Sequence, residues 1–127
     1  MLEINKNIII AKKDLEEDAK YKYEVDRYGQ FLFPNWVLNL GLIDNPLYIY
    51  IEMLTRLLTL SIKNNWIDKD SNVYIYYSNE ELERNLSKND IIFKSEEDIR
   101  KNIIFLIDKG LILKEEINKY YFNHIKF

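Results

Sequence analysis

The chain has 127 residues, a net charge of −3 from 18 basic and 21 acidic residues, and no cysteine. This length favours one domain with one hydrophobic core, and the absence of cysteine excludes disulfides and thiolate chemistry and fits a cytoplasmic setting. No apolar run approaches the roughly 18 residues that a membrane span needs, and the N-terminus lacks the small-residue cleavage site of a secretory signal. We therefore expect no membrane partner.

Residues 1–26 are predicted to form an N-terminal extension or arm ahead of a domain over residues 27–127. The three β-branched residues 8–10 predict a strand over Ile4–Ala11. The charged stretch Lys12–Tyr23 fits a helix or an ordered arm. Two interpretations remain open: a solvated extension, or an arm that docks on a partner or on a second copy of the chain.

The first half of the predicted domain contains a short helix and a long one. Pro34 follows an aromatic segment, restricts the preceding residue to extended geometry and predicts a helix over Pro34–Leu40. Asp44 or Asn45 then caps a second helix, predicted over Pro46–Lys63. Its polar side is so narrow that other elements or another subunit must enclose it, and this extra apolar surface is consistent with a homodimer.

Capping signals organise the second half. A polar turn over Asn64–Asn72 precedes a predicted strand, Val73–Tyr77. Ser78 and Glu81 then fit a capping box that opens a helix ending near Leu86.

A second capping serine, Ser95, opens the last helix, which runs to Lys109 and ends at Gly110 in a left-handed stop. Leu111–Glu115 and Lys119–Phe127 predict a hairpin. The order helix, strand, helix, turn, helix, hairpin is typical of a winged helix-turn-helix. We therefore predict an α+β fold, mostly helical, with a small antiparallel sheet.

Three motifs in this half carry a family resemblance. They are LSIKNNW at Leu60–Trp66, VYIYY at Val73–Tyr77 and NEE at residues 79–81, with a further match at residues 109–112. Together they resemble the N-terminal domain of the RepA-type plasmid replication initiators of low-GC Gram-positive bacteria. The resemblance implies a winged-helix fold that binds repeated sites at a plasmid origin. The family's initiators carry a further C-terminal domain, so we expect a fragment of an initiator or a stand-alone relative.

In such a fold the last helix enters the major groove of double-stranded DNA and the hairpin touches the backbone. Arg100, Lys101 and Asn102 have the chemistry to contact base edges or phosphates. AT-rich repeats or a palindrome are the expected sites, bound by a dimer. The predicted DNA-binding residues are Lys63, Asn64, Lys88, Lys94, Ser95, Arg100, Lys101, Asn102, Lys114, Lys119 and Lys126.

The charge pattern supports an alternative function. Residues 78–127 carry 9 basic and 10 acidic residues, whereas a strongly electrostatic DNA binder shows a basic surplus. A helical wheel also places Ile104 and Phe105 on the outer face of the last helix, where they would suit a protein partner. The alternative is a winged-helix protein-interaction module, a regulator or inhibitor from a mobile genetic element that has lost the basic surface.

We expect no enzyme, no cofactor and no metal site. His124 is the only histidine, so zinc sites and histidine-based triads lack partners. The three glycines form no phosphate-binding loop. The carboxylate pairs lie at predicted helix starts, where capping explains them.

Overall fold

The computed structural model describes residues 3–22, 33–93 and 95–126, with side chains for 8–22, 33–93 and 95–125. The predicted boundary at residues 26 and 27, the aromatic segment before Phe33, Lys94 and the side chain of Lys126 lie outside this range. No helix in it is long and apolar enough to cross a membrane. In chain order the elements are β1 (Glu3–Ile9), α1 (Lys12–Glu17), the 3-10 helices η1 (Ala19–Tyr21) and η2 (Asn35–Asn39), α2 (Asp44–Leu60), β2 (Tyr74–Tyr76), α3 (Asn79–Ser87), α4 (Glu96–Asp108), β3 (Ile112–Glu116) and β4 (Lys119–Lys126).

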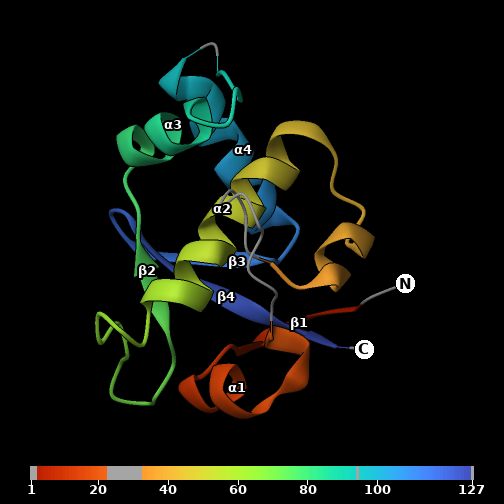
Figure 1. Cartoon of the computed structure of the whole chain (residues 1–127), viewed down its shortest axis with the longest axis vertical. Coiled ribbons are helices and arrows are strands. Elements are labelled where there is room, and N and C mark those ends of the chain that lie inside the picture. The colour runs from red at the N-terminus through yellow and green to blue at the C-terminus, as the bar shows by residue number, and fades with distance from the viewer. Residues whose placement is uncertain (1–2, 23–32, 94, 127) are drawn as a thin grey trace.

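The central strand of the sheet is β4, which pairs antiparallel with β1, β2 and β3 (Figure 1). Its residues 120–123 are all buried, because helices cover one face and the other carries packed aromatic side chains. A strand buried on both faces reads in sequence as an apolar run, not as an alternating pattern. The hairpin turn between β3 and β4 places Asn118 at a positive φ of 63°, a conformation that asparagine tolerates well.

The N-terminal segment belongs to the same fold as the rest of the chain, which corrects the interpretation of a solvated extension. Strand β1 pairs with the end of β4, with Glu3 opposite Lys126 and Ile4 opposite Ile125. Ile10, Leu15 and Tyr21 are buried in the one hydrophobic core that the later elements also build. Burying these apolar side chains provides the free energy that an extended arm would lack.

Helix α2 is the core helix, as its sequence predicts. Every residue from Ile49 to Leu60 is buried or half-buried, and the helix packs against β2, α3 and α4. These elements of the same chain provide the enclosure that its apolar faces require. The helix begins at Asp44, two residues earlier than expected, and Ile43 at the N-cap provides no side-chain cap; the predicted cap from Asp44 or Asn45 is therefore wrong.

A network around Tyr77 joins α2, β2 and α3. The Tyr77 hydroxyl donates to Glu52 Oε1 at 2.6 Å and accepts from Asn85 Nδ2 at 2.6 Å. The Arg56 guanidinium lies 3.5 Å from the centre of the Tyr77 ring and donates to the Tyr76 carbonyl at 2.9 Å. Glu52 and Arg56 belong to the narrow polar side of α2, so this side fixes where α3 starts.

Tyr77→Phe is expected to lower the free energy of unfolding by about 1–2 kcal/mol, because Glu52 and Asn85 lose their shared partner. The ring and its contact with Arg56 remain, so the change isolates the hydroxyl. Urea denaturation measures the loss. Tyr48→Phe, on α2, is the control, since Tyr48 is 37% exposed. Equal losses in the two variants would contradict a structural role for the Tyr77 hydroxyl.

Candidate nucleic-acid interface

Helix α4 has one buried face and one open face. Ser95 caps it, with Oγ accepting from the Asp98 N–H at 3.2 Å, and the carboxylates of the first turn favour the positive end of the helix dipole. Ile99, Ile103 and Leu106 face the core. The open face carries the remaining residues expected from the helical wheel: Glu97, Arg100, Lys101, Ile104, Phe105 and Asp108.

Helix α3 precedes α4 and is held by the predicted capping box. The Glu81 N–H donates to Ser78 Oγ at 3.1 Å, and the Ser78 N–H donates to Glu81 Oε1 at 3.3 Å. Arg56 Nη1 lies 3.3 Å from Glu81 Oε2. Burial by itself raises the pKa of Glu81, but the hydrogen bond from Ser78 and the charge of Arg56 outweigh it, so the pKa falls below its ordinary value of 4.5.

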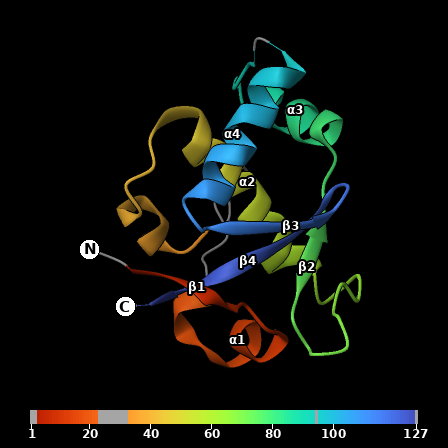
Figure 2. The same cartoon turned by 180° about the vertical axis from the view of Figure 1, so that it is seen from behind.

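The β3–β4 hairpin follows α4 directly and lies beside it (Figure 2). Asn123 Nδ2 donates to the Gly110 carbonyl at 2.6 Å and so fixes the junction between α4 and β3. On the sheet face away from α2, the rings of Tyr74 and Tyr121 lie 5.6 Å apart. Tyr121 also donates to Asp68 Oδ2 at 2.9 Å. The Asn123 contact therefore holds the hairpin at the end of α4, and the Tyr121 contacts join it to β2 and to the turn that carries Asp68.

The predicted contact residues on α4 differ in their availability. The Arg100 guanidinium donates through Nε to Glu97 Oε2 at 2.9 Å and through Nη2 to Glu97 Oε1. These hydrogen bonds lower the pKa of Glu97 and raise that of Arg100. Asn102 turns back and donates to the Asp98 carbonyl at 2.7 Å. Lys101 is exposed and, within the part of the chain that the structure describes, has no carboxylate within 4.0 Å.

The hairpin lysines differ in the same way. Lys119 Nζ donates to Glu115 Oε1 at 3.0 Å and lies 4.3 Å from the centre of the Tyr74 ring, and the hydrogen bond to Glu115 raises its pKa. Lys114 is exposed on β3, and among the described residues no acidic group pairs with it. Lys114 is therefore the more available of the two.

The open side of α4 and the adjoining β3–β4 hairpin together form the α4–hairpin face. The remaining predicted residues lie outside this face or serve another role. Ser95 is the N-cap, and Lys88 ends α3 as its exposed C-cap residue. The turn that carries the exposed Lys63 and Asn64 lies at the opposite end of the molecule from the α3–α4 turn (Figures 1 and 2). A single flat contact surface therefore does not join this turn to the start of α4.

Lys109 is a further cation of this face and is absent from the residues predicted to bind DNA. It is the C-cap residue of α4, is exposed, and places Nζ 5.4 Å from the centre of the Phe105 ring. Lys101, Phe105 and Lys109 are spaced by four residues, which puts them on one helical strip. That spacing was the signal that would have identified it.

The helices α3 and α4 are joined by a turn and followed by the β3–β4 hairpin. Together they belong to a small α+β domain in which the outer face of α4 is exposed and carries mixed charge. The family model for the replication initiator protein A (RepA) N-terminus matches residues 42–127, and the chain belongs to this family. A solved structure titled "Structure of Rep-DNA complex" is similar, with a TM-score of 0.53 and 25% sequence identity over 88% of this chain and 80% of that chain. The comparison with curated proteins found no match.

The lowered pKa of Glu81 gives a pH dependence of known sign. Its contribution to stability is fully present above pH 4.5 and is lost as the pH falls through the lowered folded-state value. Glu81→Gln keeps an acceptor but removes the charge, so it should destabilise at pH 7 and make little difference at pH values below the folded-state pKa. Urea denaturation across this range measures the difference. Glu83→Gln, on the exposed side of α3, is the matched control, and an identical pH profile for the two variants would refute the assignment.

Proposed function

We propose that this protein is the origin-binding domain of a plasmid replication initiator and binds double-stranded DNA as a winged helix, with α4 in the major groove and the β3–β4 hairpin as the wing. Membership of the replication initiator family supports a role in the initiation of plasmid replication. The observation that carries the proposal is the similarity, over 88% of the chain, to a structure whose title names a Rep–DNA complex.

The open face of α4 supplies the chemistry for this contact. Arg100 and Lys101 lie in its second turn, where an entering helix presents side chains to base edges. Lys114 and Lys109 lie beyond them, on the adjoining strand and at the end of the helix, and suit phosphates. The domain acts by binding, and we assign no catalytic residue to it.

Glu97 limits this contact. Its carboxylate binds the Nε–Nη2 edge of Arg100, one of the two edges that guanine or phosphate could use, and it places negative charge on the face that approaches DNA. The exposed pair adds little stability to the fold. Removing Glu97 therefore releases Arg100 and removes a repulsive charge at small structural cost.

Opposite effects on DNA affinity are expected from Glu97→Gln and from Lys101→Ala. Glu97→Gln should tighten binding to AT-rich origin repeats. Lys101→Ala should weaken it and reduce the salt slope by about one unit if Lys101 contacts a phosphate. The double variant Arg100→Ala with Lys101→Ala should abolish binding. Fluorescence anisotropy measures the DNA affinity of all three variants at salt concentrations from about 50 to about 200 mM, a range over which phosphate contacts change the affinity strongly.

Lys13→Ala is the control for these variants, because Lys13 is exposed on α1, away from α4. The proposal fails if the protein binds no duplex at low salt, or if binding survives the double variant unchanged. A random duplex of the same length separates sequence-specific from general electrostatic affinity.

The form of the site follows from the same proposal. Two domains related by a two-fold axis match a palindrome, and adjacent repeats recruit further copies at about one helical turn, 34–36 Å. We infer a homodimer on DNA and a low-GC Gram-positive host, the latter supported by the abundance of Ile, Asn, Lys and Tyr. Light scattering of the complex reports the number of copies bound.

A second candidate function is binding of a protein partner through α4. The observation that favours it is the exposure of Ile104 and Phe105, at 42% and 41%, on a face with balanced charge. Exposed large apolar side chains at the centre of a face are typical of protein contacts. In this case the domain would regulate or inhibit a component of its mobile element.

Phe105→Asp distinguishes the two functions. If α4 binds a protein, the variant should lose the partner in a pull-down from the host while its circular dichroism spectrum stays unchanged. Ile92→Asp is the matched control, since Ile92 is 71% exposed in the α3–α4 turn. A partner retained by Phe105→Asp would exclude this surface.

A further inference from the structure

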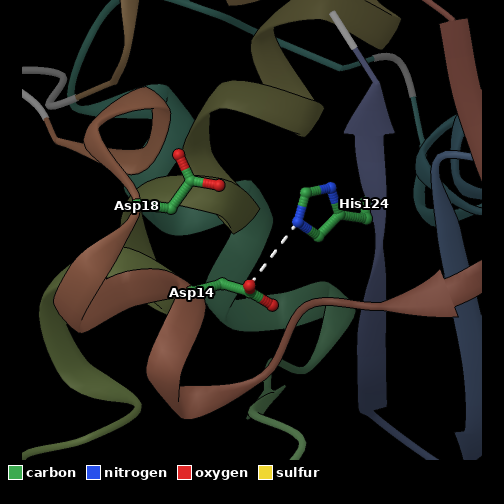
Figure 3. Close-up of side chains that lie close together, drawn as sticks. All are labelled: Asp14, Asp18 and His124. Atoms are coloured by element: carbon green, nitrogen blue, oxygen red, sulfur yellow. Dashed lines mark ion pairs between the residues drawn. The ribbon is translucent and has the colours of Figure 1, made fainter.

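Three side chains from the two ends of the chain meet beside the sheet. Asp14 comes from α1, Asp18 from the junction of α1 and η1, and His124 from β4 (Figure 3). One potential ligand atom from each lies within 4.8 Å of the others, and all three residues are half-buried. The cluster lies apart from the α4–hairpin face.

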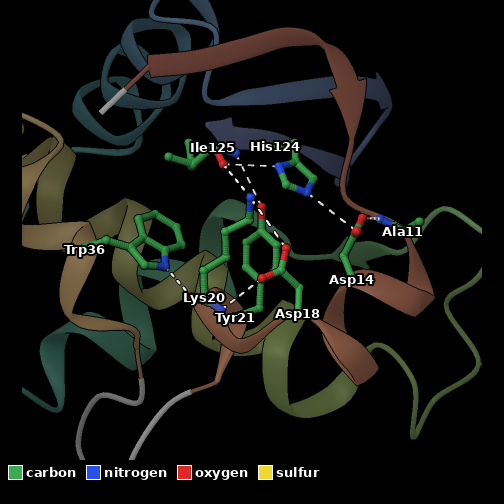
Figure 4. Close-up of polar contacts among 8 residues, drawn as sticks. All are labelled: Ala11, Asp14, Asp18, Lys20, Tyr21, Trp36, His124 and Ile125. Atoms are coloured by element: carbon green, nitrogen blue, oxygen red, sulfur yellow. Dashed lines mark hydrogen bonds and ion pairs between the residues drawn. The ribbon is translucent and has the colours of Figure 1, made fainter. Parts of the chain in front are cut away.

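Backbone contacts aim both carboxylates at the cluster. The Ala11 N–H donates to Asp14 Oδ2 at 2.8 Å, which leaves Oδ1 facing His124 Nε2 at 3.6 Å. The Lys20 N–H donates to Asp18 Oδ1 at 3.1 Å. The second oxygen of Asp18 lies 3.5 Å from Lys20 Nζ, which also donates to the Ile125 carbonyl at 3.0 Å (Figure 4).

The imidazole is oriented as a ligand. His124 Nδ1 lies 3.2 Å from the Ile125 carbonyl oxygen, and a carbonyl only accepts, so this contact places a proton on Nδ1. In the tautomer with its proton on Nδ1, the Nε2 lone pair faces Asp14 Oδ1. Two acceptors in this position repel each other unless a proton or a metal ion lies between them. A ring N–H held by a backbone carbonyl is the usual support of a metal-binding histidine.

We propose that Asp14, Asp18 and His124 bind a divalent transition metal ion of the zinc type. One imidazole nitrogen and two carboxylate oxygens form a mixed ligand set that suits zinc better than magnesium or calcium, and water completes four-coordination. Bonds of about 2.0–2.1 Å in a tetrahedron separate ligand atoms by roughly 3.3 Å, close to the 3.6 Å between His124 and Asp14. Asp18 moves inward and exchanges its contact with Lys20 for the ion.

The ion would tie the N-terminal segment to the last strand. Asp14 and Asp18 lie outside residues 42–127, the part that the family model matches, and His124 lies within it. The ammonium group of Lys20 reduces the negative potential of the site, so we expect moderate affinity. Zinc was not expected from the sequence because His124 is the only histidine, and the two carboxylates that join it lie more than a hundred positions away in the chain.

The experiment uses the full chain without a histidine tag and adds Zn²⁺ alone. Because the chain has one histidine and no cysteine, its imidazole nitrogen signals in NMR are unambiguous. Zn²⁺ should raise Tm and shift the Nε2 signal while Nδ1 stays protonated. Asp18→Asn and His124→Gln should weaken Zn²⁺ binding roughly tenfold or more by calorimetry.

Glu17→Gln is the matched control, because it removes one exposed carboxylate from the same helix and should leave Zn²⁺ affinity unchanged. Asparagine at position 18 still accepts from the Lys20 N–H, so Asp18→Asn keeps the fold, as circular dichroism will verify. Three results would overturn the proposal: no Zn²⁺ binding at millimolar concentration, equal affinity in Asp18→Asn and Glu17→Gln, or an Nε2 signal that responds to pH but not to Zn²⁺.

Discussion

Burial of α2 is the constraint on which the other elements depend. A helix whose apolar side chains cover most of its circumference must be surrounded, and β2, α3 and α4 surround it. Its polar side is not left to solvent: Glu52 and Arg56 bind the Tyr77 hydroxyl and the Glu81 carboxylate, respectively. The apolar faces of α2 therefore form the centre of the core, and its polar side fixes the position at which α3 begins. Because α4 must cover the remaining side of α2, only its outer face is available to a partner.

That outer face has too few available cations to bind DNA by charge alone. Arg100 and Lys119 are each paired with a carboxylate of the same element or hairpin, which leaves Lys101, Lys109 and Lys114. Proteins that make six to ten phosphate contacts lose about 10³–10⁵ in affinity between roughly 50 and 200 mM salt. Three contacts give a far smaller electrostatic term. If this domain binds its origin tightly, base contacts, DNA shape or several copies on repeated sites must provide the difference.

Local signals in the sequence located most elements, because their causes lie within a few residues. Ser78 and Ser95 cap α3 and α4 as predicted, Gly110 takes a positive φ of 78° at the end of α4, and the apolar spacing identified the buried face of α4. The features that sequence analysis missed depend on long-range pairing. The partner of β1 is the far end of the chain, and no local pattern records the register that sets Glu3 opposite Lys126. The pairing of Arg100 with Glu97 was readable from their i,i+3 spacing, but rotamers decide whether such a pair forms.

The N-terminal segment covers part of the edge of the central strand β4. A sheet edge with unpaired backbone groups attracts further strands, and β1 covers the edge at the end of β4 while Ile10 donates its N–H to the Phe122 carbonyl at 2.9 Å. Tyr21 closes the same corner, since its hydroxyl accepts from the Ile125 N–H at 3.3 Å and its ring lies edge-on to Trp36 and His124. Strand β1 therefore takes the position beside β4 that an added strand would use. In the proposed function a partner meets the domain through side chains on α4 and β3, and the pairing of Glu97 with Arg100 sets how much positive charge it encounters there.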